Sequence, residues 1–72
     1  MTDTATLAPP VSRTRWLALE ILVDAATGTV AELAGLAVTD PSPELLARLD
    51  FARSHLAALE AEDAALTAAL GL

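Results

Sequence analysis

The chain has no cysteine and no lysine, and it contains few glycines and aromatic residues. The absence of cysteine excludes disulfides and thiolate metal sites, and it leaves the redox compartment undetermined. The only cations are four arginines, at positions 13, 15, 48 and 53, against ten acidic residues, so the net charge is −6. An acidic chain repels phosphate, and nucleic-acid binding is therefore not favoured.

The sequence also lacks a long uninterrupted hydrophobic run. Glu20 and Asp24 interrupt its most apolar stretch, so we expect no membrane span. The N-terminus has no basic region followed by an apolar one, which argues against a signal peptide. We therefore expect a cytoplasmic protein, either free or as part of an assembled particle.

With 72 residues the chain forms one small domain at most. A domain of this size buries only about 60% of the surface that its unfolded chain exposes. Small folds usually compensate with disulfides, a metal or oligomerisation, and the lack of cysteine removes disulfides and thiolate metal sites. The sequence thus predicts a protein partner or self-association.

The clearest element is a long helix at about residues 43–70. Ser42 is a good N-cap, Pro43 suits the first helical position, and Glu44 places an anion in the first turn. Gly71 is suited to end the helix in the left-handed conformation.

Apolar residues in this helix recur at alternating steps of four and three, with Asp63 in one place of the series. The series is Leu45, Leu49, Ala52, Leu56, Leu59, Asp63, Leu66 and Leu70. This spacing is typical of a bundle helix with a broad core stripe, and also of an intermolecular coiled coil. Asp63 would then pair with an arginine of another chain or fix the register.

For the rest of the chain we expect an extended arm over residues 1–11, closed by Pro9-Pro10, and a single helical domain over residues 12–72. A first helix at about 13–27 would end at Gly28.

The segment that follows Gly28 is ambiguous. Thr29 and Glu32 match a capping box, which predicts a short middle helix at about 30–37. A hairpin turning at Ala34-Gly35 is the alternative. The predicted fold is all-α, a small helical hairpin or three-helix arrangement.

Helix lengths suggest where a partner binds. At 1.5 Å per residue the long helix spans about 42 Å, the first helix about 22 Å and the middle helix about 12 Å. Even stacked end to end, the two shorter helices would leave the C-terminal end of the long helix uncovered. Arg13, Arg15 and Trp16 form a cluster of residue types enriched at interfaces. The predicted partner interface comprises Leu7, Val11, Arg13, Arg15, Trp16, Leu56, Leu59, Asp63, Leu66 and Leu70.

Residues for catalysis are hard to assemble. Ser54 and His55 are neighbours on a helix and point about 100° apart, so they do not form a nucleophile–base pair. The carboxylates Glu20 and Asp24, and the cluster at residues 60–63, are typical of solvated helix faces. We predict no enzyme, no catalytic residues, no metal, no cofactor and no small-molecule substrate. His55 could make an interface sensitive to pH.

The sequence favours a non-catalytic structural or assembly subunit that docks through helix–helix contacts on itself or on a larger partner. Such a subunit would belong to a multi-subunit complex or a phage-like particle. The alternative is a small helix-turn-helix or antitoxin-type regulator that binds a basic protein or, with less support, DNA.

Overall fold

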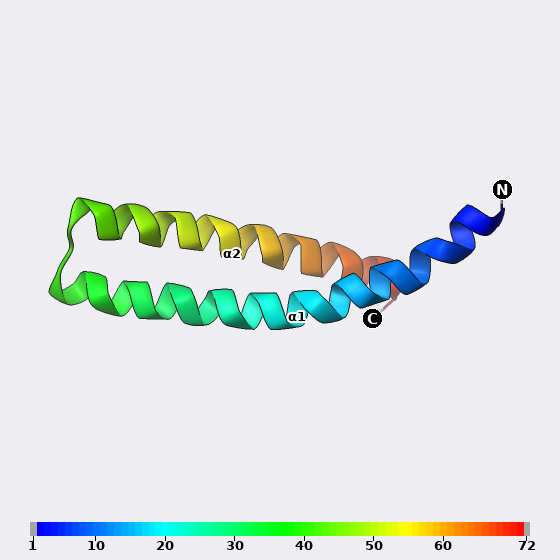
Figure 1. The fold of residues 1–72 in the computed structure, drawn as a ribbon, viewed down its shortest axis with the longest axis horizontal. Coiled ribbons are helices and arrows are strands. Elements are labelled where there is room, and N and C mark those ends of the chain that lie inside the picture. Colours follow the sequence, from blue (N-terminus) through cyan, green and yellow to red (C-terminus); the bar gives the residue numbers. More distant parts are fainter. Residues whose placement is uncertain (1, 72) are drawn as a thin grey trace.

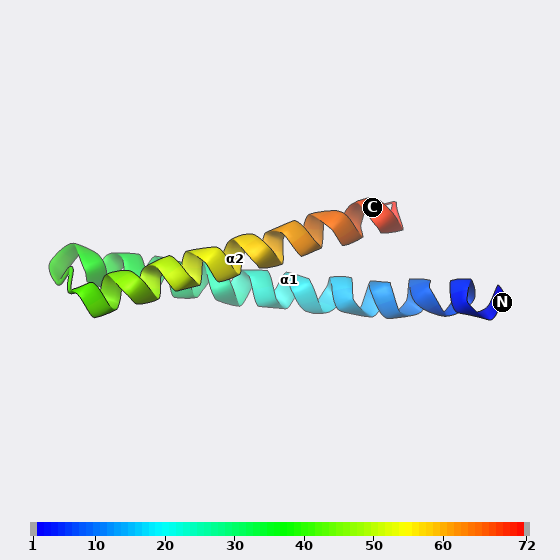
Figure 2. The same cartoon turned by 90° about the horizontal axis from the view of Figure 1, so that it is seen from above.

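The computed structural model is a hairpin of two helices (Figure 1). It describes the backbone of residues 2–71 and the side chains of residues 13–71. Helix α1 covers Thr2–Thr39, and helix α2 covers Pro43–Leu70. The helices lie side by side and antiparallel, and the N-terminal part of α1 extends beyond the end of α2 (Figures 1 and 2). The all-α prediction is confirmed, with two helices in place of three.

Helix α2 begins and ends as its sequence predicts. The Ser42 hydroxyl accepts a hydrogen bond from the backbone N–H of Leu45 at 3.2 Å, and Pro43 takes the first helical position. Gly71 has φ 76°, and its N–H donates to the carbonyl of Ala68 at 3.2 Å. Both ends are therefore capped by local chemistry.

The division of residues 13–37 into two helices is wrong, and so is the alternative hairpin at Ala34-Gly35. Helix α1 continues through Gly28 and Gly35, neither of which has a positive φ. The Thr29 hydroxyl donates to the Ala25 carbonyl one turn back, at 3.1 Å, so it bonds within the helix rather than capping a new one. Glycine costs a helix only about 1 kcal/mol, which packing against α2 on both sides of Gly28 outweighs.

The extended arm over residues 1–11 is also wrong, because α1 begins at Thr2. The φ of proline is close to helical, so α1 continues through Pro9-Pro10, although a proline in a helix interior costs about 3 kcal/mol or more. Leu7 and Val11, expected to anchor the arm, have side chains outside the described residues.

The two helices pack along matching rows of side chains, the seams. The α2 seam is the predicted series, and each of its members is buried or half-buried. The α1 seam follows the same alternating steps and consists of Trp16, Leu19, Val23, Ala26, Val30, Leu33 and Ala37. Steps of three and four keep one face of each helix turned to the other, so the two seams form an antiparallel coiled coil.

The hairpin is elongated and buries little of its surface. Its radius of gyration is 16.5 Å, whereas a compact domain of this length has about 11 Å. It exposes 5129 Å², against about 4,200 Å² for a compact monomer of 7.4 kDa. Among the described residues, the buried apolar side chains are those of Leu19, Leu49 and Leu59, and of these Leu19 is fully buried. The two helices therefore leave much apolar surface in solvent.

Replacing Gly28 or Gly35 with alanine should stabilise the hairpin by about 0.8–1 kcal/mol each, because alanine has the higher helix propensity. A Cβ at either position meets no atom within 4 Å, so no strain opposes the gain. Urea unfolding at low protein concentration measures the effect. Gly71→Ala is the matched control, and it should destabilise because φ is 76° there. Unchanged or lower stability of Gly28→Ala and Gly35→Ala would contradict a continuous α1.

Candidate functional site

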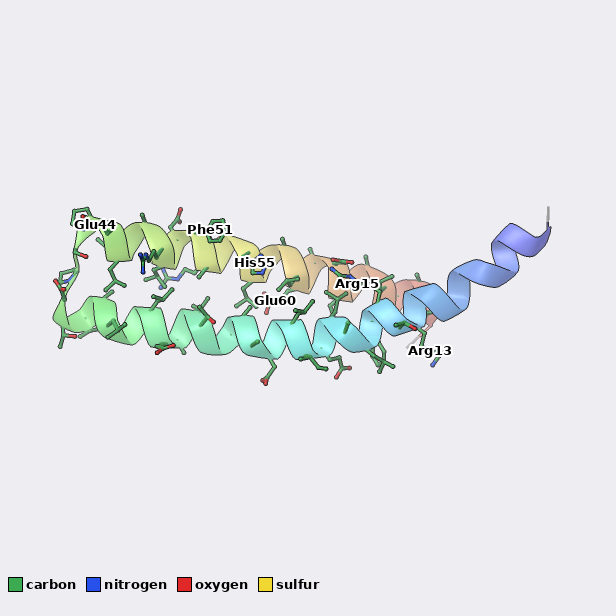
Figure 3. All side chains as sticks on the ribbon, in the orientation of Figure 1. Arg13, Arg15, Glu44, Phe51, His55 and Glu60 are labelled. Carbon is green, nitrogen blue, oxygen red and sulfur yellow. The ribbon has the colours of Figure 1, made fainter. Side chains whose placement is uncertain are left out.

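Two parts of the surface are candidates for function: the contact between α1 and the C-terminal end of α2, and a groove nearer the middle of the hairpin. The first contains residues expected from the sequence to bind a partner. Arg15 donates to both carboxylate oxygens of Glu62, from Nε at 2.7 Å and from Nη2 at 2.9 Å. Trp16 Nε1 donates to the Thr67 hydroxyl at 2.8 Å. Figure 3 shows Arg15 on the side of α1 towards α2 and Arg13 on the opposite side.

This end of α2 is covered by its own chain. Leu59 is only 7% exposed, and Leu56, Leu66 and Leu70 are half-buried on the seam. The expectation of a bare C-terminal end is wrong because α1 is longer than α2 and reaches past it. That these leucines also contact a partner stays a prediction.

The ion pair between Arg15 and Glu62 shifts the pKa of both side chains. The hydrogen bond from Arg15, with a smaller contribution from its charge, lowers the pKa of Glu62 below its ordinary value, although partial desolvation opposes this. The hydrogen bond to Glu62 and its charge raise the pKa of Arg15. The two side chains are 45% and 42% exposed, so the pair orients the helices more than it stabilises them.

Asp63 lies in the seam, whose other members are leucines and Ala52. Its side chain is half-buried, and its Oδ1 is buried without a hydrogen-bond partner among the described residues. The antiparallel register places it beside Leu19, which is fully buried. A carboxylate oxygen in such a place loses hydration without compensation. Asp63 is therefore a weak point of the seam.

The second candidate is a groove of about 460 Å³ between the helices. Its lining is Leu22, Ala25, Ala26, Thr29 and Leu33 from α1, and Arg48, Phe51, Ala52 and His55 from α2. The lining is mostly apolar, and Arg48 and His55 are its only titratable residues. Such a lining favours apolar groups over a polar substrate.

Phe51 and His55 form one wall of this groove. Their rings are parallel within 2°, with centroids 6.3 Å apart, and Figure 3 shows both on α2. Phe51 is 73% exposed, which leaves most of its ring in water. One face of the His55 ring thus has an aromatic neighbour on its own helix.

The sequence interpretation missed this groove because it divided α1 at Gly28. One signal was available: Leu22, Thr29 and Leu36 recur every seven residues, as do Arg48, His55 and Glu62. Seven-residue spacing places each trio on one side of its helix, next to the seam. A continuous α1 brings the two trios to the same side of the hairpin.

The described residues contain no group of three or more His, Cys, Asp or Glu side chains that could hold a metal ion. The carboxylates at residues 60–63 are separated by the structure, since Glu62 binds Arg15 while Asp63 enters the seam.

The expectation that no segment could span a membrane needs correction. The stretch Arg13–Thr39 of α1 is long and apolar enough to cross a bilayer, by length and composition only. Glu20 and Asp24 do not exclude a span, since a mostly apolar stretch of this length can contain two charged residues. The core helix of a soluble protein and a signal sequence meet the same criterion, so this is weak support for a membrane location.

No protein-family model matches this chain, and no curated protein or solved structure matches it at significant similarity.

Replacing Arg15 with glutamine should raise the pKa of Glu62 towards its ordinary value, because the hydrogen bond and the charge that lower it are lost. The side-chain carboxyl shift of Glu62, followed by NMR against pH, measures this. Since the folded-state pKa is lowered, the pair stabilises the hairpin above the unfolded pKa of Glu62, and this contribution is lost as pH falls through the folded value. Arg13→Gln is the control and should leave the titration unchanged. Equal midpoints in both variants would refute the ion pair.

Replacing Asp63 with leucine should stabilise the hairpin by about 1–3 kcal/mol, because it removes an unpaired buried oxygen and completes the leucine series. Thermal or urea unfolding of the two proteins measures the difference. Asp50→Leu, at an exposed position of the same helix, serves as control and should change stability by less than about 0.5 kcal/mol. Loss of stability in Asp63→Leu would show that the carboxylate has a partner in solution.

Proposed function

We propose that this chain is a non-catalytic structural or assembly subunit whose hairpin docks through helix–helix contacts on copies of itself or on a larger protein. The observation that carries the proposal is the excess of exposed surface, 5129 Å² where a compact monomer has about 4,200 Å². A subunit of a multi-subunit complex or phage-like particle would cover that excess on assembly.

The exposed surface is apolar in places where a lone soluble hairpin would carry polar residues. Ile21 and Phe51 are each 73% exposed, and Val38 is 84% exposed. Leu17 and Leu36 are more than half exposed. Apolar side chains concentrated on so small a molecule are typical of surfaces that bind protein.

A catalytic role has little support. The single histidine stacks on Phe51, and the neighbouring Ser54 points about 100° away from it around the helix. General acid–base or nucleophilic chemistry needs groups that converge on one substrate atom.

A cytoplasmic or particle-bound hairpin fits the charges better than a membrane span. Crossing a bilayer would place Glu20 and Asp24 of α1 in hydrocarbon, at about 2.5–3.5 kcal/mol for a charged residue at the centre. The charged α2 packs along the whole seam of α1 and would have to enter with it.

The alternative of a helix-turn-helix regulator is not favoured. That motif joins two helices at a steep angle of about 90–120° through a short turn. Here the helices on either side of residues 40–42 lie antiparallel (Figure 2). The net charge of −6 is the one observation that favours an antitoxin-type regulator.

The proposal predicts that association stabilises the folded state of the purified chain. Its thermal midpoint, followed by circular dichroism, should rise with chain concentration or with addition of its partner, because binding to the folded state stabilises it. A pull-down that compares the wild-type chain with Phe51→Asp as bait identifies partners that use the apolar surface. A monomer that melts cooperatively at a concentration-independent temperature, with no bound protein sensitive to this substitution, would refute the proposal.

A further inference from the structure

We propose that the hairpin pairs with a second copy of itself through the side that carries the groove, forming a four-helix bundle. This side is called the groove face below, and it consists of the groove lining with Leu36 and the Arg15–Glu62 pair at its ends. The inference rests on the proposed function and names the partner and the surface.

The area of the groove face matches what a dimer needs. Helix α2 is about 42 Å long, and the hairpin is 18 Å wide across its two helices, so one flat side covers about 750 Å². A standard interface buries about 800 Å² per partner.

The groove face carries both a hollow and a protruding side chain. The hollow exists because Ala25, Ala26 and Ala52 are small, and Phe51 stands beside it with 73% of its surface exposed. A two-fold contact requires complementary features on the same patch, since each copy presents the same surface to the other. The ring of Phe51 from one copy and the groove of the other satisfy this requirement.

Charge favours a contact centred on the groove. Two chains of net charge −6 repel each other, and the repulsion is smallest where acidic side chains stay away from the centre of the contact. The groove lining has no carboxylate, and Glu62, one seven-residue step beyond His55, is paired with Arg15. Glu32 and Glu44, one seven-residue step from Ala25 and Phe51, lie on the same side but outside the groove lining. The back of α1, by contrast, carries Asp24 among Leu17 and Ile21, so a contact between two such surfaces would bring carboxylates together.

The full chain, studied by sedimentation equilibrium from about 1 to about 300 µM, tests the proposal. The wild-type protein should reach twice the 7.4 kDa chain mass. Phe51→Asp should raise the dimer dissociation constant at least about 100-fold, because it removes a central aromatic residue and buries a charge. Ile21→Asp is the matched control, since Ile21 is equally exposed but lies on the back of α1; it should leave the dimer intact.

A second variant tests the same surface independently, in case Phe51→Asp does not fold. Ala25→Arg places a long charged side chain in the groove from the other helix and should also give a monomer. Circular dichroism should show unchanged helix content in each variant, because the substituted side chains lie outside the seam.

Three outcomes would overturn the proposal: a monomer throughout the range, a dimer that resists both groove substitutions, or a dimer broken by Ile21→Asp alone. A monomer that binds another protein or lipid vesicles through Phe51 also overturns it. Where that ligand is a protein, the proposed function stands while the second copy as partner is rejected, so the two failures are distinct.

Discussion

The packing of one seam on the other is the interaction on which the whole molecule depends. Neither helix has an independent core, and among residues 13–71 the buried apolar side chains are those of Leu19, Leu49 and Leu59. Helices in water owe most of their stability to the burial of an apolar face rather than to propensity. The turn at residues 40–42, closed by Ser42, keeps the two seams in register. At the other end, the hydrogen bonds of Arg15 and Trp16 to α2 hold the same register.

Because the two seams bury each other, the leucines of α2 are no longer the obvious surface for a partner. The free apolar residues lie beside and behind the seam, as the exposure of Phe51 and Ile21 shows. These positions follow from geometry: a heptad seam uses about two residues in seven, and the flanking positions stay in solvent. Whether they bind a partner therefore depends on their own composition rather than on the strength of the hairpin.

Helix α2 could be predicted because its signals are local. A cap, a proline at the first turn, a run of strong helix formers and a terminal glycine act within a few residues of where they stand. The continuity of α1 could not be predicted in this way, since Gly28 and Thr29 are also typical of a helix end. It is decided by Val23, Ala26, Val30 and Leu33, which continue the seam past the glycine and pack on residues distant in sequence. A helix that ends at Gly28 lacks Thr29 and Leu33 of the groove lining, so the groove could not be predicted from it.

The groove and the thin core of the hairpin have the same cause. Ala26 and Ala52 belong to the seams and also line the groove, so a methyl group stands where a leucine would fill the space. Larger side chains there would bury more surface within the hairpin and close the hollow beside it. The chain instead keeps a thin core with an open side, next to an aromatic ring that its own helices leave in water. Such an arrangement costs stability in the isolated hairpin and regains it when another apolar surface fills the hollow.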